Sequence, residues 1–196
     1  MTHIRQGEKV LLVRVFIAAL VLFFSLQSWT KADDIRDFQI EGMSIGDSAL
    51  DYFSKQEIEK NYKDWYQNVP FRYFEFSNLE SFKVYDNVGF VTKKSDINYM
   101  IYSISAMVFC RNNIKDCHKT RNDIDKQLSQ IFKDQKKITN KNIINEKNII
   151  PIQNIYTFKS GDGIVLEIRD WASESEFVDN TVIHLDTKQM RKWLNM

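Results

Sequence analysis

Residues 101–117 read IYSISAMVFCRNNIKDC. Up to Cys110, side chains alternate between two sides of an extended run, with Ile104 and Ala106 on one of them, which is the period of two typical of a β-strand. After a turn, apolar residues recur at spacings of three and four, which predicts an amphipathic helix from about residue 115 to 137. The stretch therefore predicts a strand that ends at Cys110, followed by a helix.

The chain has two cysteines, Cys110 and Cys117. Cys117 lies on the apolar face of the predicted helix, so its sulfur is expected to point back toward the end of the strand. An even number of cysteines at short spacing favours a disulfide in an oxidising compartment. Redox pairs use the closer C-x-x-C spacing, and zinc needs four nitrogen or sulfur ligands, whereas only His118 and His184 follow residue 32. We therefore expect a structural disulfide and no metal site.

The rest of the chain reads mainly as short strands. Aromatic and β-branched residues between turn residues predict further strands at 71–76, 82–85, 88–92, 155–159, 164–169 and 181–185. The turn Ser160-Gly161-Asp162-Gly163 predicts a hairpin. Residues 138–150 are rich in Asn and Lys and are interpreted as a loop that ends at Pro151.

Helix starts are marked by capping patterns. S-x-x-D/E sequences that begin at Ser44 and Ser54 predict two short helices, at about 46–53 and 55–66. Asp186-Thr187 predicts the start of a last helix. Strands in series between helices indicate an α+β fold, which we expect to be a curved antiparallel sheet with helices packed on one face.

The first 32 residues have the parts of a secretory signal peptide. Three basic residues precede the apolar run VFIAALVLFFSL (15–26), and Thr30-Lys31-Ala32 puts small residues at the −3 and −1 positions of a cleavage site. The run is shorter than the roughly 20 residues that span a membrane. We expect 1–32 to be removed and 33–196 to form a single periplasmic domain, with an uncleaved inner-membrane anchor as the alternative.

The charge of the predicted mature chain argues against nucleic-acid binding. Subtracting the four basic residues and one acidic residue of 1–32 from the chain's 27 and 26 leaves 23 and 25, without the basic stripe that nucleic acid requires. Trp171, Phe177 and Trp193 near the C-terminal loop are candidates for an aromatic surface patch. The expected partner is an envelope protein or another envelope component, and no cofactor is expected.

One motif points to an enzyme instead. Ile45-Gly46-Asp47-Ser48 resembles the first block of the GDS-type esterases and lipases (SGNH hydrolases). The resemblance implies Ser48 as nucleophile and a histidine as base. That family has an Asp-x-x-His pair near its C-terminus and a parallel α/β sheet, whereas here the C-terminal histidine is His184 and residue 181 is Thr. Capping of a helix start explains the same motif without catalysis.

The residues before this motif carry a second resemblance. Ile40-Glu41-Gly42-Met43-Ser44 is similar to the opening of short exported bacterial proteins, and to the I-x-G-M-S/T motif of BamE-type (SmpA/OmlA) outer-membrane assembly proteins. In that family, a Gly-Met-Ser/Thr turn starts a helix pair ahead of an antiparallel sheet; its lipobox cysteine is missing here. The resemblance implies a binding role. The sequence as a whole predicts an exported, non-enzymatic periplasmic binding or envelope-associated protein, with a secreted serine esterase using Ser48 and His184 as the alternative.

Overall fold

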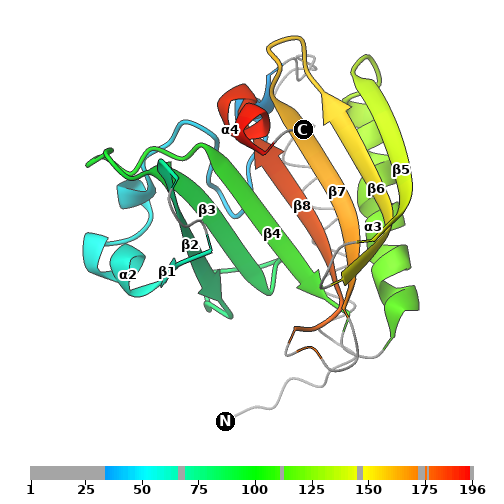
Figure 1. The fold of residues 1–196 in the computed structure, drawn as a ribbon, viewed down its shortest axis with the longest axis horizontal. Coiled ribbons are helices and arrows are strands. Elements are labelled where there is room, and N and C mark those ends of the chain that lie inside the picture. The colour runs from blue at the N-terminus through cyan, green and yellow to red at the C-terminus, as the bar shows by residue number, and fades with distance from the viewer. Residues whose placement is uncertain are drawn as a thin grey trace. The chain divides into compact units, whose positions relative to one another are not determined.

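An antiparallel sheet of eight strands lies at the centre of the computed structural model (Figure 1). The structure describes residues 34–65, 69–110, 113–144, 148–171, 175 and 177–194, all within one compact unit, Ala32–Met196. The predicted signal segment lies outside the described residues. The strands are β1 (Tyr62–Lys63), β2 (Phe71–Ser77), β3 (Asn87–Lys93), β4 (Ser103–Phe109), β5 (Lys136–Ile144), β6 (Asn148–Thr157), β7 (Gly163–Trp171) and β8 (Asn180–Asp186). The helices are α2 (Lys55–Lys60), α3 (Ile114–Ile131) and α4 (Lys188–Trp193), with 3-10 turns η1 (Ile35–Asp37) and η2 (Ala49–Asp51).

The strand order is β1-β2-β3-β4-β8-β7-β6-β5. Chain neighbours pair within β1–β4 and within β5–β8, and the two series meet where β4 pairs with β8. The register at this junction places Ser105 opposite His184. Side chains directly opposite on one face of an antiparallel pair have Cβ atoms about 4.5–5.5 Å apart, so the junction makes neighbours of two residues that are distant in the sequence.

The main core lies on the sheet face covered by α3. Ile104 and Ala106 of β4 and Leu185 of β8 are fully buried there, together with Leu128 of the helix. The N-terminal segment covers the same face with apolar side chains: Ile35, Phe38, Ile40, Met43, Ile45, Ala49 and Ile58. Complete burial of a large aliphatic or aromatic side chain contributes about 1.5–3 kcal/mol, so this face, here called the α3 face, supplies most of the hydrophobic stabilisation.

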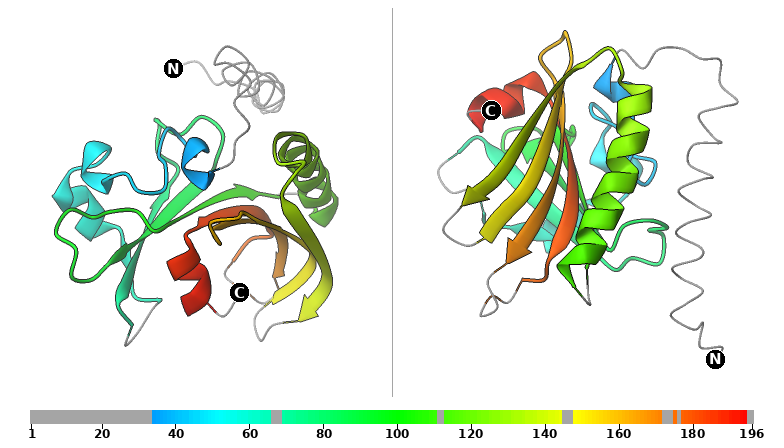
Figure 2. Two further views of the ribbon diagram at one scale, coloured as in Figure 1. Left: turned by 90° about the horizontal axis from the view of Figure 1, so that it is seen from above. Right: turned by 90° about the vertical axis from the view of Figure 1, so that its right-hand side faces the viewer.

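The helix α4 packs on the opposite face, the α4 face. Met190 is 1% exposed and clusters with Phe71, Tyr73 and Val91 of β2 and β3. Figure 2 shows the sheet curling toward the side of α4. The predicted antiparallel sheet with helices is confirmed, whereas the expectation that all helices share one face is not. The last helix, α4, lies on the α4 face because its apolar residue Met190 is buried there.

Several local predictions are confirmed by backbone geometry. The turn at Ser160–Gly163 joins β6 to β7, with Gly161 at a φ of +92°, a value that L side chains rarely adopt. Ser54 caps α2 and shares a reciprocal capping box with Glu57. The helix predicted at 55–66 nevertheless ends at Lys60, before β1, and the helix predicted at 46–53 is only the 3-10 turn η2. Thr187 caps α4 by accepting a hydrogen bond from the Met190 amide.

Residues 138–144 lie in β5 and 148–150 in β6, so the loop predicted there is wrong. Lys and Asn make up five of the nine residues of β5, and most of this edge strand is exposed, so its composition resembles that of a loop. Pro151 sits inside β6, at the register shift between Ile149 and Gln153. Proline is tolerated in strands at such irregularities because its missing amide breaks no ladder bond.

The predicted strand at 82–85 is also wrong, because its amides have another acceptor. The Glu41 carboxylate accepts hydrogen bonds from the backbone amides of Lys83 at 3.0 Å, Val84 at 2.8 Å and Tyr85 at 3.2 Å. A carboxylate that gathers successive amides holds them as a loop instead of leaving them for a neighbouring strand.

We expect Glu41→Ala to lower the free energy of unfolding by about 2 kcal/mol, because it leaves those amides without their acceptor. Urea denaturation measures the change. Glu80→Ala, at an exposed position of the same loop, is the matched control and should cost less than about 0.5 kcal/mol. Equal effects of the two substitutions would contradict this account of the loop.

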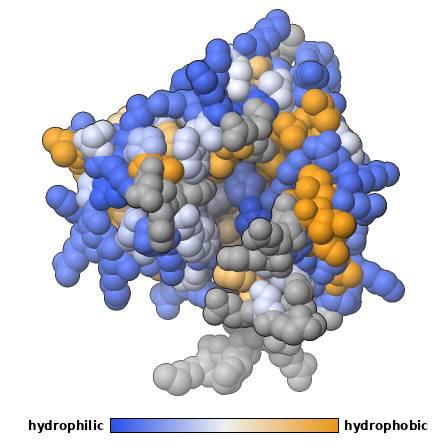
Figure 3. Space-filling view, viewed as in Figure 1, coloured by the Kyte–Doolittle hydropathy of each residue, from blue (hydrophilic) through white to orange (hydrophobic). Residues whose placement is uncertain are grey.

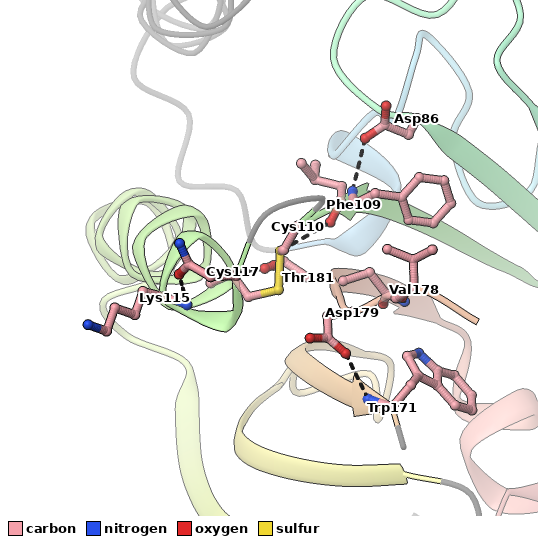
Figure 4. Close-up of a disulfide and its surroundings, with 12 residues drawn as sticks. Asp86, Phe109, Cys110, Lys115, Cys117, Trp171, Val178, Asp179 and Thr181 are labelled. Atoms are coloured by element: carbon pink, nitrogen blue, oxygen red, sulfur yellow. Dashed lines mark hydrogen bonds between the residues drawn. A yellow bond between two sulfur atoms is a disulfide. The ribbon is translucent and has the colours of Figure 1, made fainter. Parts of the chain in front are cut away.

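The predicted disulfide is confirmed. Cys110 and Cys117 are bonded with an S–S distance of 2.05 Å, and their Cα atoms lie 5.4 Å apart. Figure 4 shows the bond joining the end of β4 to the first turn of α3. Thr181 of β8 donates a hydrogen bond to the Cys117 carbonyl at 3.0 Å, and the Cys110 amide donates to Asp179 at 2.8 Å. The bond therefore fixes α3 at the β4–β8 junction.

Loss of the disulfide should lower the free energy of unfolding by roughly 2–3 kcal/mol, since closing so short a loop removes limited entropy from the unfolded chain. Cys110→Ser and Cys117→Ser should have equal effects, and each should match the effect of reducing the wild type. Differential scanning calorimetry with and without reductant makes the comparison. A reductant-insensitive melting temperature in the wild type would contradict it.

Candidate functional site

Ser48 and His184 are not brought together. The Ser48 hydroxyl donates to the Asn98 carbonyl at 2.6 Å and accepts from the Leu50 amide, capping η2. Its neighbour Ala49 is buried in the core of the α3 face. His184 points to the α4 face, because both of its strand neighbours belong to that same core. The two side chains have different hydrogen-bond partners, and Ser48 has the geometry of a helix cap.

His184 lies in a network of its own. Arg169 Nη2 is 3.0 Å from His184 Nε2, and Arg169 Nε donates to Glu167 Oε1 at 2.9 Å. Gln153 Nε2 donates to the other Glu167 oxygen at 2.8 Å. The four residues come from β6, β7 and β8, where alternation places them all on the α4 face. The Arg169 and His184 side chains keep 23% and 21% of their surface exposed.

Glu167 is held as a carboxylate by this network. His184 Nε2 lies 3.8 Å from Glu167 Oε1, and Arg169 Nε donates to the same oxygen at 2.9 Å. Burial alone would raise the pKa of Glu167, but the contacts with His184, Arg169 and Gln153 outweigh it and lower that pKa to about 2. A general base works best with a pKa near the operating pH, so Glu167 is better suited to orienting Arg169 than to moving protons.

A second cluster of polar side chains lies on β2 and β4, on the other side of the β4–β8 junction from His184. The Tyr73 hydroxyl is 3.2 Å from Ser105 Oγ and donates to Glu75 Oε2 at 3.1 Å. The tyrosine ring end occupies the space above Gly89, where an added Cβ would lie 2.0 Å from its hydroxyl. Because Ser105 is opposite His184 in register, the two hydrogen-bonded groups are neighbours on the α4 face. We call this row the polar track: Tyr73, Glu75, Ser105, His184, Arg169, Glu167 and Gln153.

An aromatic pair lies at each end of the polar track. Trp171, two residues beyond Arg169 on the same face of β7, has its ring 4.6 Å from that of Phe177, which is 43% exposed. Figure 4 shows the Trp171 indole pointing away from the disulfide. At the other end, Trp65 stacks on Tyr73 with ring centres 4.7 Å apart and is 51% exposed.

The expected aromatic patch is therefore divided. Trp171 and Phe177 lie together, but Trp193 packs 5.5 Å from Phe71 in the cluster beneath α4. Figure 3 shows the α4 face hollowed near its middle, with hydrophilic side chains in the hollow and hydrophobic ones to its right, over β5 and β6.

Comparison with protein-family models, curated proteins and solved structures finds no match to this chain.

A third cluster, on the opposite face, combines groups that can support catalysis. Lys137 Nζ lies 2.8 Å from Asp125 Oδ1 and 3.1 Å from Ser129 Oγ, and the Tyr156 hydroxyl is 2.9 Å from the same serine. Burial opposes the charge of Lys137, but its hydrogen bonds with Asp125 and Tyr156 raise its pKa above the ordinary value. A lysine held protonated cannot accept the serine proton. The cluster ties α3 to β5 and β6, which is a structural role.

The described part of the chain contains neither a membrane-spanning helix nor a metal-binding cluster. None of its helices is long and apolar enough to cross a membrane. Nor do its His, Cys, Asp and Glu side chains gather in threes or more as a metal ion would require.

Sequence reasoning missed most of the polar track. His184 was singled out, but as a base for Ser48, while Tyr73, Ser105, Glu167 and Arg169 were treated as ordinary strand residues. The sequence held one signal: Glu167 and Arg169 alternate with the apolar residues Leu166 and Ile168 in the predicted strand. Which of them become neighbours depends on the pairing of β4 with β8.

Proposed function

We propose that this protein is exported from the cytoplasm and binds a component of the bacterial cell envelope through the polar track and its two aromatic pairs, without catalysing a reaction. The observation that carries the proposal is a pair of adjacent polar groups on the α4 face, in which Arg169 and His184 are partly exposed, with exposed aromatic side chains beyond each group.

Two features support export. The sequence of 1–32 has the order of a signal peptide, with a cleavage site after Ala32. The Cys110–Cys117 bond is of the kind that persists in oxidising compartments. Fractionation of the native host with intact-mass analysis tests this part: we expect a periplasmic chain that begins at Asp33 with its disulfide intact. A full-length, reduced chain in the cytosol would overturn it.

The geometry supports binding better than catalysis. Glu167 is held as a carboxylate by its partners, and the Ser105 hydroxyl lies between Tyr73 and the Gly89 carbonyl in a buried position. We expect a fluorophosphonate probe, which labels activated serines, to leave the protein unmodified. Labelling that disappears in Ser48→Ala or Ser105→Ala would contradict the non-enzymatic proposal.

Co-sedimentation with envelopes isolated from the native host tests binding. Phe177→Ala removes an exposed ring from one aromatic pair and should weaken sedimentation about tenfold. Tyr62→Ala removes an aromatic side chain of similar exposure, 37% against 43%, which packs on Phe74 of the α3-face core, and should change nothing. Equal sedimentation of both variants and the wild type would mean that the envelope is bound elsewhere.

A further inference from the structure

We infer that β5 is a docking edge for an extended, acidic segment of another protein, which pairs with it as an additional strand of the sheet. The inference goes beyond the proposed function, because β5 contributes no residue to the polar track. It is carried by the open backbone of β5 and by the charge and exposure of its side chains.

β5 forms an open edge of the sheet. The strand order ends with β5, which has β6 as its neighbour, and Figure 1 shows it at the outer margin. Its register with β6 is continuous from Lys136 to Lys141 and then skips Asn142, whose φ is +53°. Along the continuous run, the amide and carbonyl groups of alternate residues point away from β6. Such a row of backbone groups pairs with another extended polypeptide chain.

β5 has little of the protection that keeps exposed edges from pairing. Edge strands are commonly protected by short length, proline or outward lysine side chains. β5 has nine residues and no proline, and Lys137 is turned onto α3, where its Nζ lies 2.8 Å from Asp125. Lys136 and Lys141 therefore remain at the two ends of the continuous run, and Ile138 between them is 42% exposed.

The side of β5 that faces α3 favours acidic side chains on the incoming strand. Lys137 and Arg121 share the carboxylate of Asp125, at 2.8 and 3.6 Å. Lys141 is exposed and lies on the same side as Lys137 by alternation, and β5 contains no acidic residue. Three cations therefore face one carboxylate on this side. Opposite charges across a strand pair stabilise it, and like charges destabilise it.

The side of β5 that belongs to the α4 face favours apolar side chains. Ile138 lies opposite Ile155 of β6, which is itself only partly buried. Apolar residues at alternate positions of the incoming strand would cover Ile138. A second copy of the chain is disfavoured, because self-pairing of β5 brings the three lysines of one strand beside those of the other. The occupant that matches both sides is a strand in which acidic and apolar residues alternate.

Fluorescence anisotropy with labelled peptides of the same length as β5, nine residues, tests the inference. The probe alternates Glu with Val. One control peptide has Lys in place of every Glu, and a second has proline at its centre. We expect the Glu/Val peptide to bind saturably and both controls to bind at least tenfold more weakly, because the first reverses the charge and the second lacks a ladder amide. Added salt should weaken binding of the Glu/Val peptide.

Variants and hydrogen exchange locate the binding edge. Lys141→Glu should weaken binding of the Glu/Val peptide about fivefold, since it reverses an exposed charge beside the new strand. Lys94→Glu, at an exposed lysine just after β3, is the matched control and should leave binding unchanged. Amides within 136–141 should exchange at least tenfold more slowly when the peptide is bound.

Three results would overturn the inference: no saturable binding of the Glu/Val peptide at millimolar concentration, equal binding of the Lys/Val peptide, or protection confined to amides outside β5. Protection of 136–141 that rises with protein concentration in the absence of peptide would also overturn it, and would identify a second copy of the chain as the occupant. None of these results depends on envelope sedimentation or on Phe177, so they leave the proposed function to its own test.

Discussion

Glu167→Gln is expected to lower the free energy of unfolding by about 3 kcal/mol at neutral pH. The Glu167 side chain is 6% exposed, and its two oxygens hold Arg169 and Gln153. The substitution preserves shape but removes the charge that balances the Arg169 guanidinium. Breaking one partner of a buried ion pair typically costs about 3–5 kcal/mol because the other charge stays unpaired. Arg169 is partly exposed, which places the expected cost at the lower end.

The same carboxylate should make the wild type sensitive to acid. The folded-state pKa of Glu167, about 2, lies below its ordinary value of 4.5, so between these values the unfolded chain binds more protons than the folded one. Stability from this group is therefore fully present above about pH 5 and is lost as the pH falls toward 2. A pKa difference of about 2.5 corresponds to about 3 kcal/mol.

Chemical denaturation between pH 2 and 7 measures both effects. The wild type and Glu167→Gln should differ by about 3 kcal/mol at pH 7 and nearly converge near pH 2, since the carboxyl is then protonated in the unfolded chain and about half protonated in the folded one. The comparison isolates Glu167 from other acids, including Asp125, whose hydrogen bonds with Lys137 and Tyr156 outweigh burial and also lower its pKa. Glu80→Gln, exposed in a loop, should follow the wild-type curve. Parallel curves for wild type and Glu167→Gln would rule out the buried pair as the cause.

Local patterns predicted most elements whose pairing partner lies nearby in the chain. The β6–β7 hairpin, α3 and the disulfide follow from glycine placement, three-to-four periodicity and cysteine spacing. The two wrong predictions have different causes. The segment 82–85 has strand composition, but Glu41, forty residues earlier, takes its amides. The edge strand β5 has loop composition because most of its side chains are exposed and need not be apolar.

The site was harder to predict because it depends on register. A base for Ser48 was sought from the order of residues along the chain, but β4 and β8 pair so that Ser105 is the serine opposite His184. The alternation of side chains shows which residues of one strand share a face. It does not show which other strand pairs with that strand, or in which register. The pairing of β4 with β8 therefore makes neighbours of polar residues that are distant in the sequence.

The second large effect is expected at Gly89, where alanine should lower the free energy of unfolding by about 3 kcal/mol. A Cβ there would lie 2.0 Å from the Tyr73 hydroxyl and 2.4 Å from its ring carbon Cζ. Tyr73 is 4% exposed and lies between Trp65 and the sheet. It would have to swing out, and lose a buried ring and its contact with Ser105.

A double-mutant cycle tests this mechanism. If the cost of Gly89→Ala arises from Tyr73, then Tyr73→Ala should remove it, and the second substitution should cost less than about 0.5 kcal/mol in that background. Urea denaturation of the four proteins gives the coupling. Equal costs of Gly89→Ala in both backgrounds would place the strain elsewhere.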